Sequence, residues 1–147
     1  MKHLAQRNLA LVQLETGDAR NALPTLRRHL ASYRAAPADA RNAMSEAALN
    51  LNLGRAYLQD GQPLEALPLL RQSVEILVPT YPKSPGLALS RCWLGLCLLT
   101  LGDEAEARVL ARAAHATFAA QPSTGIHYRR ALALLEERLA ARQGATT

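Results

Sequence analysis

The chain has 147 residues, of which 49% are hydrophobic and only 4% aromatic, and its formal net charge is +5. Alanine and leucine are abundant and β-branched residues are scarce, which favours packed helices and argues against a sheet. The basic charge permits nucleic acid, a membrane surface or an acidic protein as partner and selects none of them. We find no apolar run long enough to span a membrane and no signal-peptide pattern, so we expect a cytoplasmic location.

Capping residues and prolines predict three helices in the first part of the chain. The first runs from about residue 1 to residue 16. The second follows Asp18, a good N-cap residue, and ends at Pro37. Asp39 is expected to cap the third helix, which reaches Gln59.

Three more helices follow with equally clear start signals. The fourth opens with Pro63 at its first position, and Pro79 and Pro82 are expected to stop it. The fifth opens at Ser84, which precedes a proline, and reaches Leu101. Asp103 begins a sequence typical of a capping box, which predicts the start of the sixth helix.

A seventh helix is expected over about residues 124–142, after a cap at Ser123 or Thr124, and residues 143–147 are expected to form a disordered tail. Its apolar residues share one face: Tyr128, Leu132, Leu135 and Leu139. A single apolar stripe with a charged opposite face is typical of a helix that caps the end of a stack.

The predicted turns belong to an internal repeat. Their glycines, Gly17, Gly61 and Gly102, are 44 and 41 residues apart. Small and large residues recur at fixed distances from them: Ala22, Ala66 and Ala107; Ala10, Gly54 and Gly95; Tyr33, Leu77 and Phe118. Small residues allow two helices to cross closely, and larger ones fill the space between hairpins. The sequence therefore predicts three stacked helical hairpins.

The second copy has a recognisable signature: Leu53, Gly54, Tyr57, Gly61, Ala66, Leu70 and Ser73. These residues resemble a tetratricopeptide repeat, and the spacing above 40 residues resembles the longer, kinesin-light-chain-like type. The resemblance implies an all-α, right-handed superhelical solenoid of three hairpins plus a capping helix. We expect one domain over residues 1–142, with repeats at about 1–37, 39–82 and 84–122 and the capping helix at about 124–142. The resemblance also implies a protein–protein interaction scaffold.

The positive charge has one ordered feature, which is the recurrence of Arg20, Arg27 and Arg34 every seven residues. This spacing keeps the three side chains near one face of the second helix. A solvated outer face is the favoured interpretation, ahead of a surface for an acidic protein. Nucleic acid is disfavoured because Tyr33 is the one aromatic residue close by, and single-strand binding needs several. The preference for arginine over lysine is typical of a high-GC bacterial coding sequence.

The sequence shows none of the patterns that carry chemistry. There is no nucleophile elbow, P-loop or dinucleotide-binding motif, and the four histidines have no metal-ligand spacing. His115 takes the repeat position of Leu30 and Val74, so we expect it along a helix interface. Cys92 and Cys97 lie five residues apart and are expected to be buried, reduced thiols. We expect no enzyme activity, no metal and no cofactor.

In tetratricopeptide arrays the first helix of each hairpin lines a concave groove. The resemblance carries this role onto Leu4, Arg7, Leu11, Leu14, Leu51, Arg55, Leu58, Leu89, Leu96 and Leu99. So apolar a surface suits a helical or extended apolar segment of a partner, with Arg7 and Arg55 contacting acidic residues at its rim. The alternative is that the hairpins curl tightly and bury much of this face themselves.

Two other roles remain open. The chain would act as a regulatory appendage of a larger bacterial signalling protein, such as a kinase or a transcriptional regulator, or it would self-associate into a homo-oligomer through its apolar groove. No polar cap precedes the first predicted helix. We therefore expect either that the chain is a fragment of a longer protein or that this end packs on something.

Overall fold

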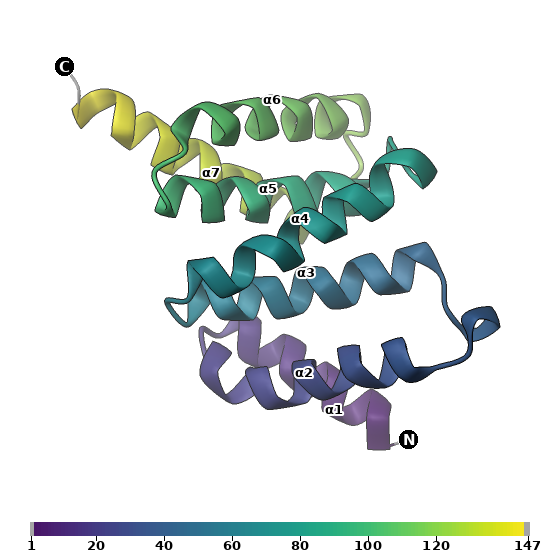
Figure 1. The fold of residues 1–147 in the computed structure, drawn as a ribbon. Helices are drawn as coiled ribbons and strands as arrows, with labels where there is room; N and C mark the ends of the chain where they lie inside the picture. Colours follow the sequence, from purple (N-terminus) through teal and green to yellow (C-terminus); the bar gives the residue numbers. More distant parts are fainter. Residues whose placement is uncertain (1, 146–147) are drawn as a thin grey trace. The chain divides into compact units, whose positions relative to one another are not determined.

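The computed structural model describes residues 2–145, and within them the fold is all-α, as predicted (Figure 1). The helices are α1 (Lys2–Glu15), α2 (Ala19–Ala35), α3 (Ala43–Gln59), α4 (Pro63–Thr80), α5 (Pro85–Thr100), α6 (Glu104–Ala120) and α7 (Ile126–Ala145), with a 3-10 turn, η1 (Ala38–Ala40), before α3. Successive helices form adjacent hairpins. None of the described helices is long and apolar enough to cross a membrane.

The chain divides into two compact units, Met1–Leu77 and Val78–Thr147, called unit 1 and unit 2 below. Unit 1 contains α1, α2, α3 and most of α4, and unit 2 contains α5, α6 and α7. The boundary falls within the last turn of α4. Each unit is described by itself.

The three hairpin turns share one backbone conformation. Gly17, Gly61 and Gly102 have φ values of 83°, 77° and 94°, a left-handed region that glycine enters without steric cost. In each turn the N–H of the residue after glycine donates to a carbonyl five residues earlier: Asp18 to Gln13 at 2.7 Å, Gln62 to Tyr57 at 2.8 Å and Asp103 to Leu98 at 2.8 Å. This is the Schellman arrangement, which satisfies the last carbonyls of a helix.

Two of the predicted helix caps are confirmed. The Ser84 side chain accepts a hydrogen bond from the backbone N–H of Leu87 at 3.1 Å, which caps α5. The Asp103 carboxylate accepts one from the backbone N–H of Glu106 at 3.1 Å, which caps α6. Each bond satisfies a donor that the first turn of the helix leaves unpaired.

The other caps differ from the prediction. α7 begins at Ile126, and the Thr124 hydroxyl donates to the Gln121 carbonyl at 2.8 Å. Asp39 lies in η1, and it is Asn42 that caps α3 by accepting from the backbone N–H of Ser45 at 2.9 Å. Asp18 takes the N-cap position of α2, but its carboxylate accepts from the Asn21 side chain at 2.9 Å and makes no side-chain cap bond. The 3-10 turn delays the start of α3, which moves the capping position past Asp39.

The core of unit 1 lies between α1, α2 and α3 and is made of alanine and leucine. Its buried members are Ala10, Leu14, Ala19, Ala22, Leu23, Leu26, Leu30, Leu53 and Ala56. In the second hairpin, α3 and α4 cross closely at Gly54, where an added Cβ would lie 2.8 Å from Cγ of Leu70. The Ser73 hydroxyl of α4 donates to the Ala47 carbonyl of α3 at 2.8 Å.

Three of the four arginines of α2 contact the second hairpin. Arg20 Nε lies 3.4 Å from the Asp60 carboxylate, and Arg27 Nε donates to the Tyr57 hydroxyl at 2.7 Å. The Arg27 guanidinium also lies 5.2 Å from the centre of the Tyr57 ring, a cation–π contact. Arg34 reaches the side-chain oxygens of Asn50 and Gln72. The seven-residue spacing therefore places these arginines along a seam between two hairpins, although all three remain exposed.

In unit 2 α5 and α6 pair and α7 packs against both, most extensively against α5. The crossing is close at Gly95, where an added Cβ would lie 2.7 Å from Cδ2 of Leu135 in α7. The predicted apolar stripe of α7 is buried at Leu132, Leu135 and Leu139. Arg142 donates to the Leu99 carbonyl at 3.1 Å. That contact holds the last turns of α7, which extends beyond the predicted end at residue 142 to Ala145; residues 146 and 147 lie outside the described part.

Replacement of Gly54 by leucine is expected to lower the free energy of unfolding by about 2 kcal/mol, because the new side chain must displace the buried Leu70. Chemical denaturation measures the change. The matched control is Gly144→Leu, since no atom lies within 4 Å of a Cβ placed there. Equal stability of the Gly54→Leu variant and the wild type would contradict the close crossing.

Replacement of Arg27 by alanine is expected to cost about 1 kcal/mol of stability, because it removes both the hydrogen bond and the cation–π contact with Tyr57. Arg28→Ala is the control, since Arg28 donates only to Thr25 on its own helix and should change stability by less than about 0.5 kcal/mol. Thermal unfolding measures both changes. Equal melting temperatures of the two variants would show that the Arg27–Tyr57 contacts do not contribute measurably to stability.

Burial raises the pKa of the Cys92 thiol from 9.0 to about 12, with a smaller contribution from the Glu136 carboxylate. Because the thiolate is the reactive form, Cys92 in a Cys97→Ala background should resist a thiol reagent at pH 8 until the protein unfolds. Stability should also fall as the pH rises from about 9 towards 12, since the unfolded chain loses this proton first. Rapid labelling of the native variant would contradict this account.

Candidate functional site

The sequence-predicted site residues of α1 occupy different environments. Arg7 is exposed and Leu11 is half-buried, whereas Leu14 is 1% exposed and belongs to the core of unit 1. Leu14 is therefore a packing residue and offers no surface to a partner. The side chain of Leu4 lies outside the described residues.

The site residues of α3 lie beside those of α1. Leu51 is 8% exposed and Leu58 is half-buried. Arg55 forms an ion pair with Glu15 of α1, with Nη1 2.8 Å from Oε1, and its side chain is only 15% exposed. Arg55 was expected to act as a cation at the rim of the groove, but its charge is already paired with the Glu15 carboxylate of the same chain. We call the surface formed by Arg7, Leu11, Glu15, Arg55 and Leu58 the inner face of unit 1.

The site residues of α5 are mostly unavailable. Leu89 is half-buried, but Leu96 and Leu99 are 1% and 3% exposed. The reason is α7, whose residues Arg138 and Arg142 face Leu96 and Leu99 across a small cavity of about 290 Å³. The capping helix α7 thus covers this part of the face that the sequence assigned to a partner.

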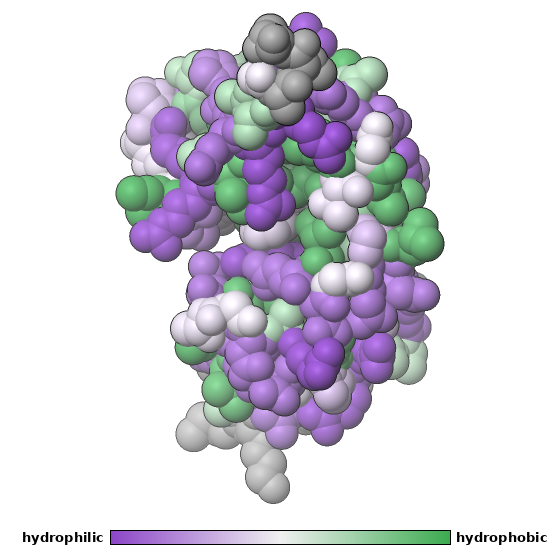
Figure 2. Space-filling view, turned by 90° about the vertical axis from the view of Figure 1, so that its left-hand side faces the viewer, coloured by the Kyte–Doolittle hydropathy of each residue, from purple (hydrophilic) through white to green (hydrophobic). Residues whose placement is uncertain are grey.

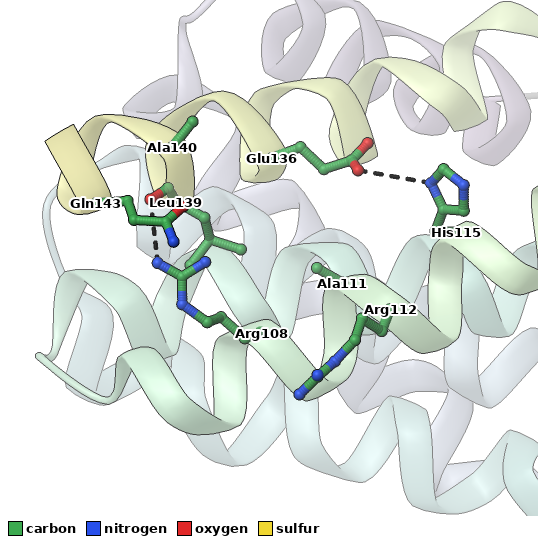
Figure 3. Close-up of a pocket in the computed structure, with 8 residues that line it drawn as sticks. All are labelled: Arg108, Ala111, Arg112, His115, Glu136, Leu139, Ala140 and Gln143. Atoms are coloured by element: carbon green, nitrogen blue, oxygen red, sulfur yellow. Dashed lines mark hydrogen bonds and ion pairs between the residues drawn. The ribbon is translucent and has the colours of Figure 1, made fainter.

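A second hollow, between α6 and α7 in unit 2, was not predicted from the sequence (Figure 3). It has a volume of about 410 Å³ and is lined by Arg108, Ala111, Arg112, His115, Glu136, Leu139, Ala140 and Gln143. A neighbouring hollow of about 360 Å³ shares His115 and Glu136, so the two form one groove along the helix pair. We call it the α6–α7 groove.

The α6–α7 groove is bridged by His115 and Glu136, whose Nδ1 and Oε2 lie 3.5 Å apart (Figure 3). His115 lies along the interface of α6 and α7, as its repeat position predicted, with its side chain 65% exposed. Arg108 pairs with Glu104 and donates to the Leu139 carbonyl. The substitution of His115 for the leucine and valine of the other repeats was the signal in the sequence, because an apolar interface does not need a histidine.

Within the described residues no group of histidine, cysteine or acidic side chains is placed to hold a metal ion. On the face drawn in Figure 2, hydrophobic side chains form small separate patches among polar ones. The inner face of unit 1 combines an ion pair across two helices with half-buried leucines, and His115 and Glu136 bridge the two helices of the α6–α7 groove.

Comparisons with known proteins agree with the fold. Residues 45–120 match the tetratricopeptide repeat family. A crystal structure of TPR-like repeats from Podosopora anserina, in a protein assigned as a kinesin light chain, is 24% identical, with a TM-score of 0.71 over 99% of this chain and 77% of that one. A single-substitution variant of those repeats gives 23% identity and a TM-score of 0.70 over 99% and 76%. No curated protein sequence matches.

The two structures show the fold, and the family match extends over more than half of the chain. The matched segment contains Gly61 and Gly102, two of the three glycine turns, and also Gly54 and Gly95 themselves. These are the features from which the sequence predicted the repeat. The chain belongs to the tetratricopeptide repeat family.

Proposed function

We propose that this chain is a non-catalytic protein-interaction scaffold and that the inner face of unit 1 binds a helical or extended segment of a protein partner. Tetratricopeptide repeats are scaffolds for protein–protein interaction, and the family and fold support that role here. The proposal needs no metal and no cofactor.

The observation that carries the proposal is the mixed character of the inner face. Leu11 and Leu58 are half-buried, so each presents part of an apolar side chain to solvent. The Glu15–Arg55 ion pair links α1 to α3 between them and holds the two helices in one arrangement. A preformed surface of this kind binds without a large ordering cost.

Arg7 gives the inner face its selectivity. Its side chain is exposed, and Arg55 is already paired with Glu15. An incoming segment that places a carboxylate near Arg7 gains a charge-assisted hydrogen bond, whereas a basic segment meets a like charge. The preferred ligand is therefore a short segment with apolar residues flanked by an acidic one.

Selection from a random peptide library on the immobilised protein tests this proposal. Wild type should enrich peptides that combine leucine-like residues with aspartate or glutamate. Arg7→Glu should weaken the best of them about tenfold, which corresponds to about 1.4 kcal/mol and is expected from the loss of one ionic hydrogen bond. Fluorescence anisotropy measures the affinities.

Arg28→Glu is the matched control, because it makes the same change of charge on the opposite helix of the first hairpin. It should leave the affinity of the selected peptides unchanged. Peptides without acidic residues, or equal binding by the wild type and Arg7→Glu, would show that the inner face is not the binding surface.

A further inference from the structure

Two large apolar side chains of α1 are exposed on a face that the inner face does not include. Leu9 is 57% exposed and Val12 is 56% exposed. They lie three residues apart, so they share one side of the helix. Exposed leucine and valine at this spacing form an apolar strip that no described side chain of unit 1 covers.

The repeat shows what these positions do elsewhere in the chain. Counted from the turn glycines, Leu9 corresponds to Leu53 in α3 and to Leu94 in α5, and Val12 corresponds to Ala56 and Cys97. All four equivalents are buried, with exposed fractions of 5%, 3%, 0% and 0% in that order. The positions of Leu9 and Val12 are thus packing positions in both other copies.

Unit 1 itself shows which partner fits such a face. Leu53 and Ala56 of α3 share one core cluster with Leu23, Leu26 and Leu30 of α2. Those leucines are spaced i, i+3 and i+7, which puts them on one side of an amphipathic helix. A helix with leucines at the same spacing would cover Leu9 and Val12 in the same way.

The charges around the face differ from those in the α2–α3 contact. There, Arg20 of α2 pairs with Asp60 and Arg34 contacts Gln72. In the first hairpin the equivalent positions are Thr16, which has no charge, and Arg28, which is exposed. An incoming helix with arginines would meet Thr16 in place of the Asp60 carboxylate and would face Arg28, whereas an acidic helix would be attracted to Arg28.

We propose that the strip formed by Leu9 and Val12 binds an acidic amphipathic helix of a partner protein, with leucines at i, i+3 and i+7. The helices of a second copy fit this strip less well: α4 has Leu67, Leu70 and Val74 at the equivalent positions, but Leu70 is fully buried against Gly54 of its own hairpin. The α2 helix of such a copy is arginine-rich and uses its leucines in its own core. On α6 the positions equivalent to those leucines are Arg108, Ala111 and His115. This surface is separate from the inner face and does not depend on the function proposed for it.

The probe is a synthetic peptide with the sequence of residues 19–36, in which the arginines are replaced by glutamate and Pro24 by alanine to favour a helix. It keeps the three leucines of α2. Wild type should bind it more tightly than the same peptide with its arginines retained. Leu9→Glu should weaken binding of the acidic peptide by about tenfold or more, through lost apolar contact and added repulsion. Anisotropy and helical circular dichroism measure both effects.

Three further variants distinguish this surface from the inner face and from other exposed leucines. Leu64→Glu makes the same change at another exposed leucine of unit 1, 74% exposed, and should leave the affinity unchanged. Arg28→Glu should weaken binding of the acidic peptide, and Arg7→Glu should not, which is the reverse of their effects on inner-face peptides.

Three results would overturn the proposal. One is failure of wild type to bind the acidic peptide. Another is equal binding by wild type and Leu9→Glu. The third is a wild-type dimer, seen by light scattering at micromolar concentration, that Leu9→Glu converts to a monomer, because the occupant would then be a second copy.

Discussion

The left-handed glycine at each hairpin turn is the constraint on which the rest of the structure depends. Gly17, Gly61 and Gly102 reverse the chain with the same Schellman hydrogen bonds, so every position counted from them has the same place in its hairpin. Gly54 and Gly95 lie the same distance before their turns, and each is crossed closely by another helix: Gly54 by α4 of its own hairpin and Gly95 by α7. Because the register is shared, residues at the same distance from their turn glycines can be compared between hairpins.

Residues at equivalent repeat positions nevertheless differ in how deeply they are buried. Leu30 is buried in unit 1, whereas His115 at the same repeat position is exposed beside the α6–α7 groove. Leu53 is buried, whereas Leu9 at its repeat position is exposed. The exposed copy is polar on α6 and apolar on α1. A polar side chain is well solvated in water, whereas covering an exposed apolar pair lowers the free energy.

Arginine provides most of the positive charge of the chain, and the structure uses it mainly for internal contacts. Arg27 lies over the Tyr57 ring, Arg55 is paired with Glu15, and Arg142 donates to a backbone carbonyl. A planar guanidinium with several donors suits such bridges between helices better than an ammonium group. Net charge was therefore a poor guide to the partner, because most of these cations already have contacts within their own unit.

The sequence by itself determined the helices, their glycine turns and the family, because propensity, capping and repeat spacing act within one hairpin. The tertiary structure decided which apolar residues are exposed. Leu96 and Leu99 were assigned to a groove, but α7 covers them, and Leu14 belongs to the core of unit 1. Likewise Arg55 is held by Glu15, forty residues away in the chain. Burial depends on contacts between distant segments, and local sequence patterns carry no record of those contacts.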